Sequence, residues 1–200
     1  MRFVALLLFF AAVCPAATRK LTVVVNFEKP HSDASVVALR HELASLLEPA
    51  GLDVDVMLRS ELPPYPEFGE LVVFEMKGSC SMKGIPSPMG ELPTELGPLA
   101  MAYSSDGQIL HFGEVECDRV RECLQRVTGR GSPEKHQAAF GNALGIVMAH
   151  ELYHMLAGVK AHTKGGLTKK SLSARELLNG ELSVPAAVGE SLRRGLAYHP

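Results

Sequence analysis

The stretch Ala149-His150-Glu151-Leu152-Tyr153-His154 places two histidines four residues apart, with a glutamate directly after the first. On an α-helix, residues at this spacing lie one turn apart and about 40° apart around the axis, so both imidazoles can reach one metal ion. Glu151 lies on a neighbouring part of the same face, where it can contact a metal-activated water without binding the metal. The spacing therefore predicts His150 and His154 as metal ligands and Glu151 as a general base.

The flanking sequence predicts that this stretch lies near the end of a long helix. Ser132 is a good N-cap, Pro133 suits the first helical position, and Gly158 provides a stop after Ala157. The residues expected to face the core are Phe140, Leu144, Val147, Met148, Leu152 and Met155. A third metal ligand must come from beyond this helix, and His162 is the first candidate.

The first 17 residues have the features of a signal peptide. Arg2 gives a short positive region, residues 3–13 form an apolar run of 11, and Cys14-Pro15-Ala16-Ala17 offers small residues for cleavage. The run is too short to span a bilayer. We therefore expect a secreted or periplasmic protein that begins near Thr18; lipidation of Cys14 and an uncleaved anchor are weaker alternatives.

Composition argues against nucleic acid as a partner. The formal net charge is −2, and loss of Arg2 with the signal peptide would make it about −3. No basic stripe and no interleaving of aromatic and basic residues is visible. No second apolar run is long enough for stable membrane insertion. The remaining length, residues 18–200, predicts a single domain with a substantial core, and the oligomeric state stays open.

Three cysteines remain after the predicted cleavage: Cys80, Cys117 and Cys123. An oxidising compartment favours one disulfide. Cys117 and Cys123 are six residues apart in a predicted helix, which places their Cα atoms about 9 Å apart, beyond disulfide reach. Cys80 is therefore expected to pair with one of the two, and Cys117, at a strand-to-helix junction, is favoured.

The N-terminal half predicts alternating strands and a helix. Residues 20–27, 53–58 and 71–76 have strand patterns, and Ser32 can cap a helix that Pro49 and Gly51 end. The apolar face expected for that helix comprises Val36, Val37, Leu39, Leu43, Leu46 and Leu47. The β-α-β order suggests that the first two strands are parallel neighbours.

A hairpin and a short helix are expected between this half and the long helix. Residues 77–98 are rich in Gly, Pro and Ser and predict an irregular segment. Residues 99–103 and 108–112 predict a hairpin because Asp106-Gly107 supplies the turn, and residues 118–127 predict a helix. We expect the strand at 108–112 to lie at the sheet edge, where a peptide substrate can add as a further strand.

The segment from His150 to His162, together with the order of elements, resembles the zincin superfamily of zinc metallopeptidases, and within it the metzincins. Metzincins carry HExxHxxGxxH, with a methionine-containing turn below the metal. Here Gly158 comes one residue later than in that pattern, His162 comes two residues later, and no methionine follows His162. The stretch 165–167 is a candidate for the place of that turn, with Leu167 as an apolar floor. The resemblance covers the active-site region and the general order of elements.

The resemblance implies an α+β, zincin-like fold: a mixed twisted sheet packed on a long active-site helix, with a small helical C-terminal part at about 163–200. It implies Zn²⁺ bound by His150, His154 and His162. It also implies an exported metalloprotease, most simply an endopeptidase, that hydrolyses peptide bonds in a peptide or protein substrate with a zinc-activated water and Glu151 as general base.

Three alternatives remain open at this stage. In the thermolysin-like pattern the third ligand is a glutamate from a later helix, and Glu176 lies 22 residues after His154. Glu176 also fits a simpler role as the acid three residues after a Ser173 cap. The displaced third histidine supports a catalytically inactive zincin-like metal-binding or scaffold protein. An exported domain without metal is the remaining reading.

Overall fold

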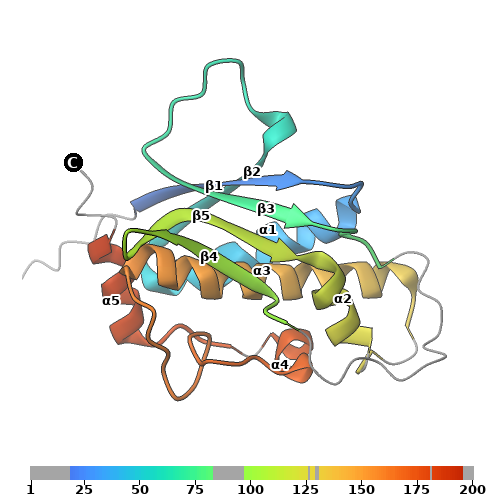
Figure 1. Cartoon of the computed structure of the whole chain (residues 1–200). Coiled ribbons are helices and arrows are strands. Elements are labelled where there is room, and N and C mark those ends of the chain that lie inside the picture. The colour runs from blue at the N-terminus through green and yellow to red at the C-terminus, as the bar shows by residue number, and fades with distance from the viewer. Residues whose placement is uncertain (1–18, 83–96, 126, 129–130, 181, 196–200) are drawn as a thin grey trace, which may run out of the picture.

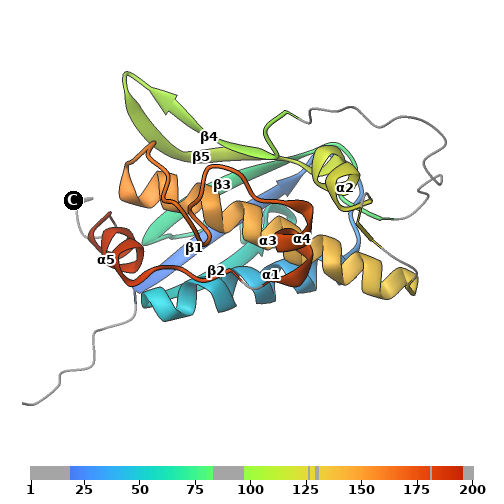
Figure 2. The ribbon, with the colours of Figure 1, turned by 90° about the horizontal axis from the view of Figure 1, so that it is seen from below.

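A five-stranded sheet lies across one long helix, α3, and α1 runs beside α3 on the same face of the sheet (Figures 1 and 2). The computed structural model describes residues 19–82, 97–125, 127–128, 131–180 and 182–195. The strands are β1 (Arg19–Phe27), β2 (Leu52–Leu58), β3 (Glu70–Lys77), β4 (Ala100–Ser105) and β5 (Gln108–Glu116). The helices are α1 (Asp33–Leu47), α2 (Cys117–Gln125), α3 (Pro133–Ala157), α4 (Ala174–Asn179) and α5 (Ala186–Gly195), with short 3₁₀ turns η1 (Glu48–Ala50) and η2 (Arg59–Glu61). This arrangement confirms the predicted α+β class.

The sheet has the order β2-β1-β3-β5-β4, and β4 alone runs antiparallel to its neighbour. β1 and β2 pair in parallel across the α1 crossover, as predicted from the β-α-β order. The β4–β5 hairpin turns at Asp106 and Gly107, which both have positive φ (50° and 80°), as the Asp-Gly signal requires.

The prediction that residues 108–112 form the edge strand is wrong. β5 lies inside the sheet because it pairs with β4 on one side and, in parallel, with β3 on the other. β4 is the edge strand instead. The hairpin pattern predicts that β4 and β5 pair with each other. It does not predict which of them also pairs with β3, because that parallel pairing joins segments far apart in the sequence.

Helix α3 has 16 buried residues among its 25, and two glycines let it approach α1 closely. A Cβ added to Gly141 would lie 2.2 Å from the Ser35 carbonyl oxygen, and one added to Gly145 would lie 3.0 Å from that of Leu39. The Ser35 hydroxyl donates to the Gln137 carbonyl at 3.0 Å. The backbones of α1 and α3 are thus in near contact, and this contact fixes the position of α3 under the sheet.

Both helices were predicted in nearly their observed extent. α3 has the Ser132 cap and the Gly158 stop, and all six residues expected to face the core are buried. On α1, five of the six expected residues face inward, but Val37 is wrongly assigned, since 65% of its surface is exposed. Val37 lies just outside the stripe that packs on α3, so the buried face of α1 is narrower than its apolar pattern.

A disulfide joins Cys80 to Cys117, the pairing favoured from the sequence. It ties the end of the β3 segment to the first residue of α2. At the other end of the molecule, α5 packs on the end of α3, where a Cβ on Gly195 would overlap the Leu156 carbonyl. These two contacts hold the elements around α3 at both of its ends.

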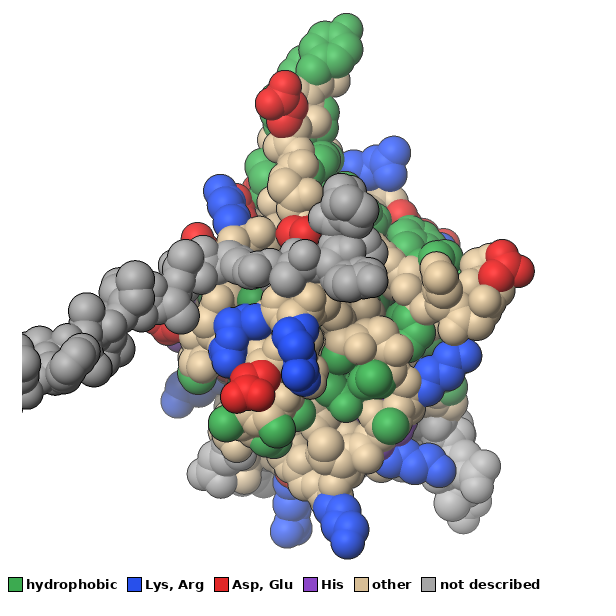
Figure 3. All heavy atoms as spheres, turned by 90° about the vertical axis from the view of Figure 1, so that its left-hand side faces the viewer, with side chains coloured by type: hydrophobic (Ala, Val, Ile, Leu, Met, Phe, Trp, Pro, Cys, Tyr) green, Lys and Arg blue, Asp and Glu red, His purple; other side chains and the backbone are tan. Residues whose placement is uncertain are grey.

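The connection between β2 and β3 stands out from the open face of the sheet (Figures 1 and 3). Tyr65 in this connection is 93% exposed. No helix in the described part of the chain is long and apolar enough to cross a membrane. The predicted signal peptide, residues 1–17, lies outside the described residues, so it stays a prediction.

Candidate metal centre

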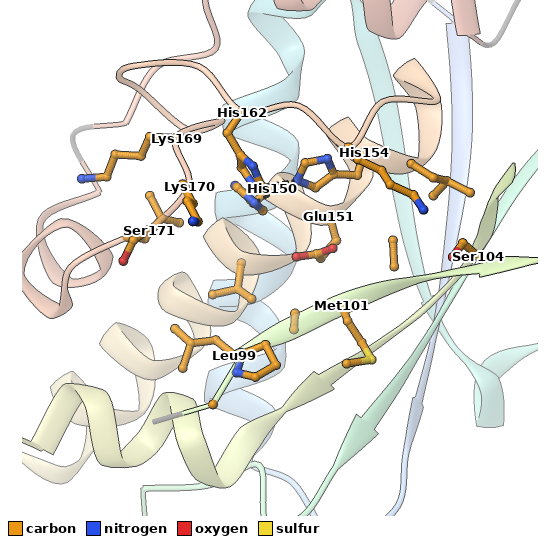
Figure 4. A pocket seen from close by; sticks show the side chains of 18 of the residues that line it. Leu99, Met101, Ser104, His150, Glu151, His154, His162, Lys169, Lys170 and Ser171 are labelled. Atoms are coloured by element: carbon orange, nitrogen blue, oxygen red, sulfur yellow. Dashed lines mark hydrogen bonds between the residues drawn. The ribbon is translucent and has the colours of Figure 1, made fainter. Parts of the chain in front are cut away.

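Three histidine side chains meet beside α3 (Figure 4). His150 and His154 come from the last two turns of the helix, and His162 comes from the loop that follows. The Nε2 atom of His154 lies 3.1 Å from that of His150 and 3.2 Å from that of His162. The structure therefore brings together all three predicted ligands, although metal binding itself stays a prediction.

The outer ring nitrogens show which tautomer two of these histidines adopt. His150 Nδ1 lies 2.8 Å from the Leu167 carbonyl, and His154 Nδ1 lies 2.7 Å from the Val159 carbonyl. A carbonyl only accepts hydrogen bonds, so each Nδ1 carries the proton and each Nε2 presents a lone pair. Burial lowers the pKa of both imidazoles, which favours their neutral form.

Two lone pairs that face each other at 3.1 Å repel unless a cation lies between them. Zn²⁺ with Zn–N bonds of about 2.0–2.1 Å and tetrahedral angles places its ligand nitrogens about 3.3 Å apart. The separations of the histidine nitrogens are close to that value. A carbonyl on the far ring nitrogen is also the usual support of a metal-binding histidine. The residues present therefore fit a zinc ion.

The loop from Gly158 to Leu172 is held in place by its own hydrogen bonds. Gly158 adopts a positive φ of 62°, which turns the chain out of α3. Further along, the Thr163 amide donates to the Thr168 carbonyl at 2.9 Å, and the hydroxyls of the same two threonines lie 2.7 Å apart. This closed loop presents His162 and brings the Leu167 carbonyl to His150.

Glu151 lies between the histidines and strand β4 (Figure 4). Only 8% of its surface is exposed. Burial raises its pKa to about 7, while a hydrogen bond from the Ala102 backbone acts in the opposite direction. A carboxyl group with a pKa near 7 can both accept and return a proton near neutral pH. Its side chain does not join the histidine cluster, which suits the predicted role of a base and not of a ligand.

A cavity of about 720 Å³ opens beside the histidines. One wall is the edge strand β4 with the residues before it, a second is α3 at Val147 and Glu151, and a third is the stretch 169–172. The cleft thus runs along the outer edge of β4, which pairs with no other strand in the described part of the chain, and passes the histidine cluster.

Glu176, the alternative third ligand, does not reach the cluster. It lies on α4 and binds the Lys169 ammonium group with both carboxylate oxygens, at 2.5 and 2.6 Å. It also forms a capping box with Ser173, so its simpler predicted role is confirmed. Hydrogen bonds from Lys169 and then from Ser173 lower its pKa to about 2.

Sequence reasoning missed two parts of this site. The carbonyls of Val159 and Leu167 are backbone groups, and nothing in the sequence distinguishes them from other carbonyls. The lysines that line the cavity, Lys160, Lys169 and Lys170, could have been noticed from their closeness to His162 in the sequence.

No protein-family model and no curated protein sequence matches this chain. Among solved structures, the fold is similar to a crystal structure of archaemetzincin from Methanopyrus kandleri, with a TM-score of 0.54. The match covers 92% of this chain and 99% of that chain, at 13% sequence identity. At this identity the likeness concerns the fold alone, and the fold of this chain is thus an archaemetzincin-like one.

Proposed function

We propose that this chain is a zinc-dependent peptidase, with His150, His154 and His162 as ligands and Glu151 as general base. The observation that carries the proposal is the meeting of three histidine Nε2 atoms, two of them unprotonated, beside a buried carboxyl group in one cleft. The archaemetzincin-like fold supports it. Zinc bound at this place would lower the pKa of a water molecule and polarise a substrate carbonyl.

The residues of the chain account for the remaining steps of peptide hydrolysis. The Glu151 carboxylate accepts the proton of the attacking water and returns it to the leaving amine, since it lies beside the histidines in a mostly buried place. The Leu167 and Val159 carbonyls keep His150 and His154 in the tautomer that leaves Nε2 free for a metal. No further acid or base from the chain is required for this reaction.

We propose that the substrate is a peptide segment that lies along β4. β4 is an edge strand of six residues, Ala100–Ser105, and an extended peptide can pair with such an edge. The cavity wall includes residues 97–102 and Ser104, which extend along this edge and the segment before it. The length of this edge supports an endopeptidase, because it leaves room for substrate residues on both sides of the metal.

We further propose that the protein is exported and that residues 18–200 form one metallopeptidase domain. The apolar run at residues 3–13, followed by Ala16-Ala17, supports export. The Cys80–Cys117 disulfide supports an oxidising compartment, because such bonds are rare in reducing ones.

The test of the zinc proposal is the metal content of the purified protein and of its His162→Ala variant, measured side by side. About one zinc per chain is expected for the wild type, with much of it lost in the variant. A wild type that takes up no zinc after supplementation would overturn the proposal. His136→Ala is a suitable control, because His136 lies on α3 outside the cluster.

A second function, a metal-binding scaffold without peptidase activity, is favoured by two features of the sequence. Residues 163–200 contain no methionine, and the third histidine is displaced relative to the metzincin pattern. Hydrolysis of an unfolded protein such as casein by the zinc-loaded chain separates the two functions. Zinc binding without hydrolysis of any unfolded substrate supports the scaffold.

A further inference from the structure

The charges that line the cleft differ from those of the chain as a whole. The whole chain has 20 Lys and Arg against 22 Asp and Glu. The described residues that line the cleft include three lysines, Lys160, Lys169 and Lys170, and one carboxylate, Glu151. The chain as a whole is slightly acidic, but the described residues that line the cleft carry more positive than negative charge.

Only one of the three lysines is neutralised by a neighbour. Lys169 binds Glu176 at 2.5 Å. Lys160 and Lys170 are exposed, and neither forms an ion pair within the described part of the chain. Two ammonium groups thus face the cleft with no ion-pair partner among the described residues.

The two lysines lie in different parts of the loop that builds the site. Lys160 follows Val159, whose carbonyl holds His154, and precedes His162 by two residues. Lys170 lies with Lys169 and Ser171 on the side of the cleft away from Ser104 (Figure 4). A substrate that lies along β4 past the histidines therefore passes within reach of these ammonium groups.

A cleft with one sign of charge concentrates substrates of the opposite sign and speeds their association. An exposed ion pair in such a place contributes about a twofold to fivefold gain in affinity. Two lysines acting together give about a tenfold preference at low salt. The preference shrinks at high salt because the Debye length falls from about 10 Å at 0.1 M to about 3 Å at 1 M.

We propose that the cleft selects peptides with acidic side chains near the bond that is hydrolysed, and that Lys160 and Lys170 are the specificity-determining residues. The inference rests on the proposed peptidase function, whose substrate class it names. The positive groups line the walls of a cleft that runs along the outer edge of β4, the last strand of the sheet among the described residues. An extended acidic peptide matches both features, the strand edge with its backbone and the lysines with its side chains.

The test uses two fluorescent peptides with blocked ends that differ only in having glutamates or glutamines. Their affinities are measured by anisotropy with the full-length, zinc-supplemented Glu151→Gln protein, so that binding is read without turnover. Their kcat/KM values are measured with the wild type. We expect the glutamate peptide to bind about tenfold more tightly at low salt, with a ratio that approaches one in 1 M NaCl.

Charge-reversal variants test whether Lys160 and Lys170 cause the preference for the glutamate peptide. Lys160→Glu and Lys170→Glu, each added to Glu151→Gln, are expected to reduce the preference about fivefold or more. Lys164→Glu is the matched control, because Lys164 is exposed in the same loop but does not line the cleft. It changes the net charge equally and is expected to leave the ratio unchanged.

The outcomes separate the two proposals. Equal binding of both peptides, binding of neither, or an equal effect of Lys164→Glu and Lys170→Glu overturns the acidic preference. Hydrolysis of both peptides at equal kcat/KM does the same and leaves the peptidase function intact. A retained binding preference with no hydrolysis by the wild type overturns the peptidase function and upholds the charge selection.

Discussion

The candidate metal centre is built from two parts of the chain that differ in almost every physical respect. α3 supplies His150, Glu151 and His154 from a helix that packs beside α1 on one face of the sheet. The loop 158–172 supplies His162 and the two supporting carbonyls from the surface. His154 is 7% exposed, whereas His162 is exposed. The helix therefore holds two of the three histidines and the glutamate in the packed interior, and the loop brings the third histidine to them from an exposed position.

The same division separates structural from functional effects of mutation. A change on the buried face of α3 alters the helix position and with it His150, His154 and Glu151. A change in the loop acts on His162, on the carbonyls that bond the other two histidines, or on the lysines that face the cleft. Four experiments test this division.

Glu151→Gln gives the largest expected effect, because it removes the proposed general base and keeps the shape of the side chain. We expect kcat/KM to fall by about 10²–10⁴. Zinc content and thermal stability are expected to stay near those of the wild type. Glu134→Gln is the control, since Glu134 lies exposed in the first turn of the same helix. Full activity in Glu151→Gln would show that another group accepts the proton.

Two glycine-to-alanine changes compare the stability of the helix and the loop directly. At Gly141 the new Cβ would lie 2.2 Å from a backbone oxygen, so α3 must move away from α1. The higher helix propensity of alanine, about 1 kcal/mol, does not compensate for this clash. We expect the free energy of unfolding to fall by about 1–3 kcal/mol, measured by urea denaturation.

At Gly165 in the loop, no atom lies within 4 Å of the added Cβ. Gly165→Ala is therefore expected to leave stability unchanged or to raise it by up to about 1 kcal/mol. If both variants lose equal stability, the loop is as tightly packed as the helix and the division fails.

Thr168→Val tests whether the hydrogen bonds of the loop hold the metal ligands. Thr168 is fully buried, and its hydroxyl lies 2.7 Å from that of Thr163, next to the Leu167 carbonyl that supports His150. Loss of one such bond costs about 1 kcal/mol. We expect zinc affinity, measured by chelator competition, to fall by up to about tenfold. The effect is limited because the Thr168 hydroxyl does not contact His150 and acts only through the position of the Leu167 carbonyl. Thr22→Val, at a buried threonine of β1, should not change it.

The smallest effect concerns the ion pair that anchors the end of the loop. Hydrogen bonds from Lys169 and Ser173 lower the Glu176 pKa to about 2, below its unfolded value of about 4.3. The stabilisation is therefore complete above pH 4.3 and is lost as the pH falls towards 2. Because the pair is partly exposed, solvent screens it and the contribution is small.

The measurement is the difference in unfolding free energy between the zinc-free wild type and Glu176→Gln. It is expected to be constant from pH 7 to about 5 and to shrink between about pH 4 and 2. When Glu176→Gln is made in a Lys169→Met background, most of its effect on the unfolding free energy at pH 7 should disappear. In a Lys164→Met background the effect should remain. A difference that does not change with pH would mean that the carboxylate contributes no charge interaction.

Features set by local chemistry were predictable from the sequence. Ser132-Pro133 and Gly158 mark the ends of α3, Asp106-Gly107 marks the hairpin, and helix geometry excludes a bond between Cys117 and Cys123. Features set by packing between distant segments were not. The edge position of β4 depends on the β3–β5 pairing, and the exposure of Val37 depends on where α3 lies against α1.

The candidate site shows the same limit. His150, Glu151 and His154 follow from one spacing on one helix, and His162 follows from its closeness in the sequence. The Leu167 and Val159 carbonyls do not follow, because their role depends on how the loop closes.

The close contact between α1 and α3 also has a consequence for the order of events in folding. Ser35 and Gln137, which bond across this contact, are 102 residues apart in the sequence. The part of the α1 surface that packs on α3 therefore has no partner during synthesis until α3 has left the ribosome, and closing so long a segment is slow. Metal uptake can only follow this step, because His162 meets the other two histidines after α3 is in place. A chain that remains unfolded during export would thus acquire its metal in the compartment where it folds, and the metal supply of that compartment would decide whether the site is filled.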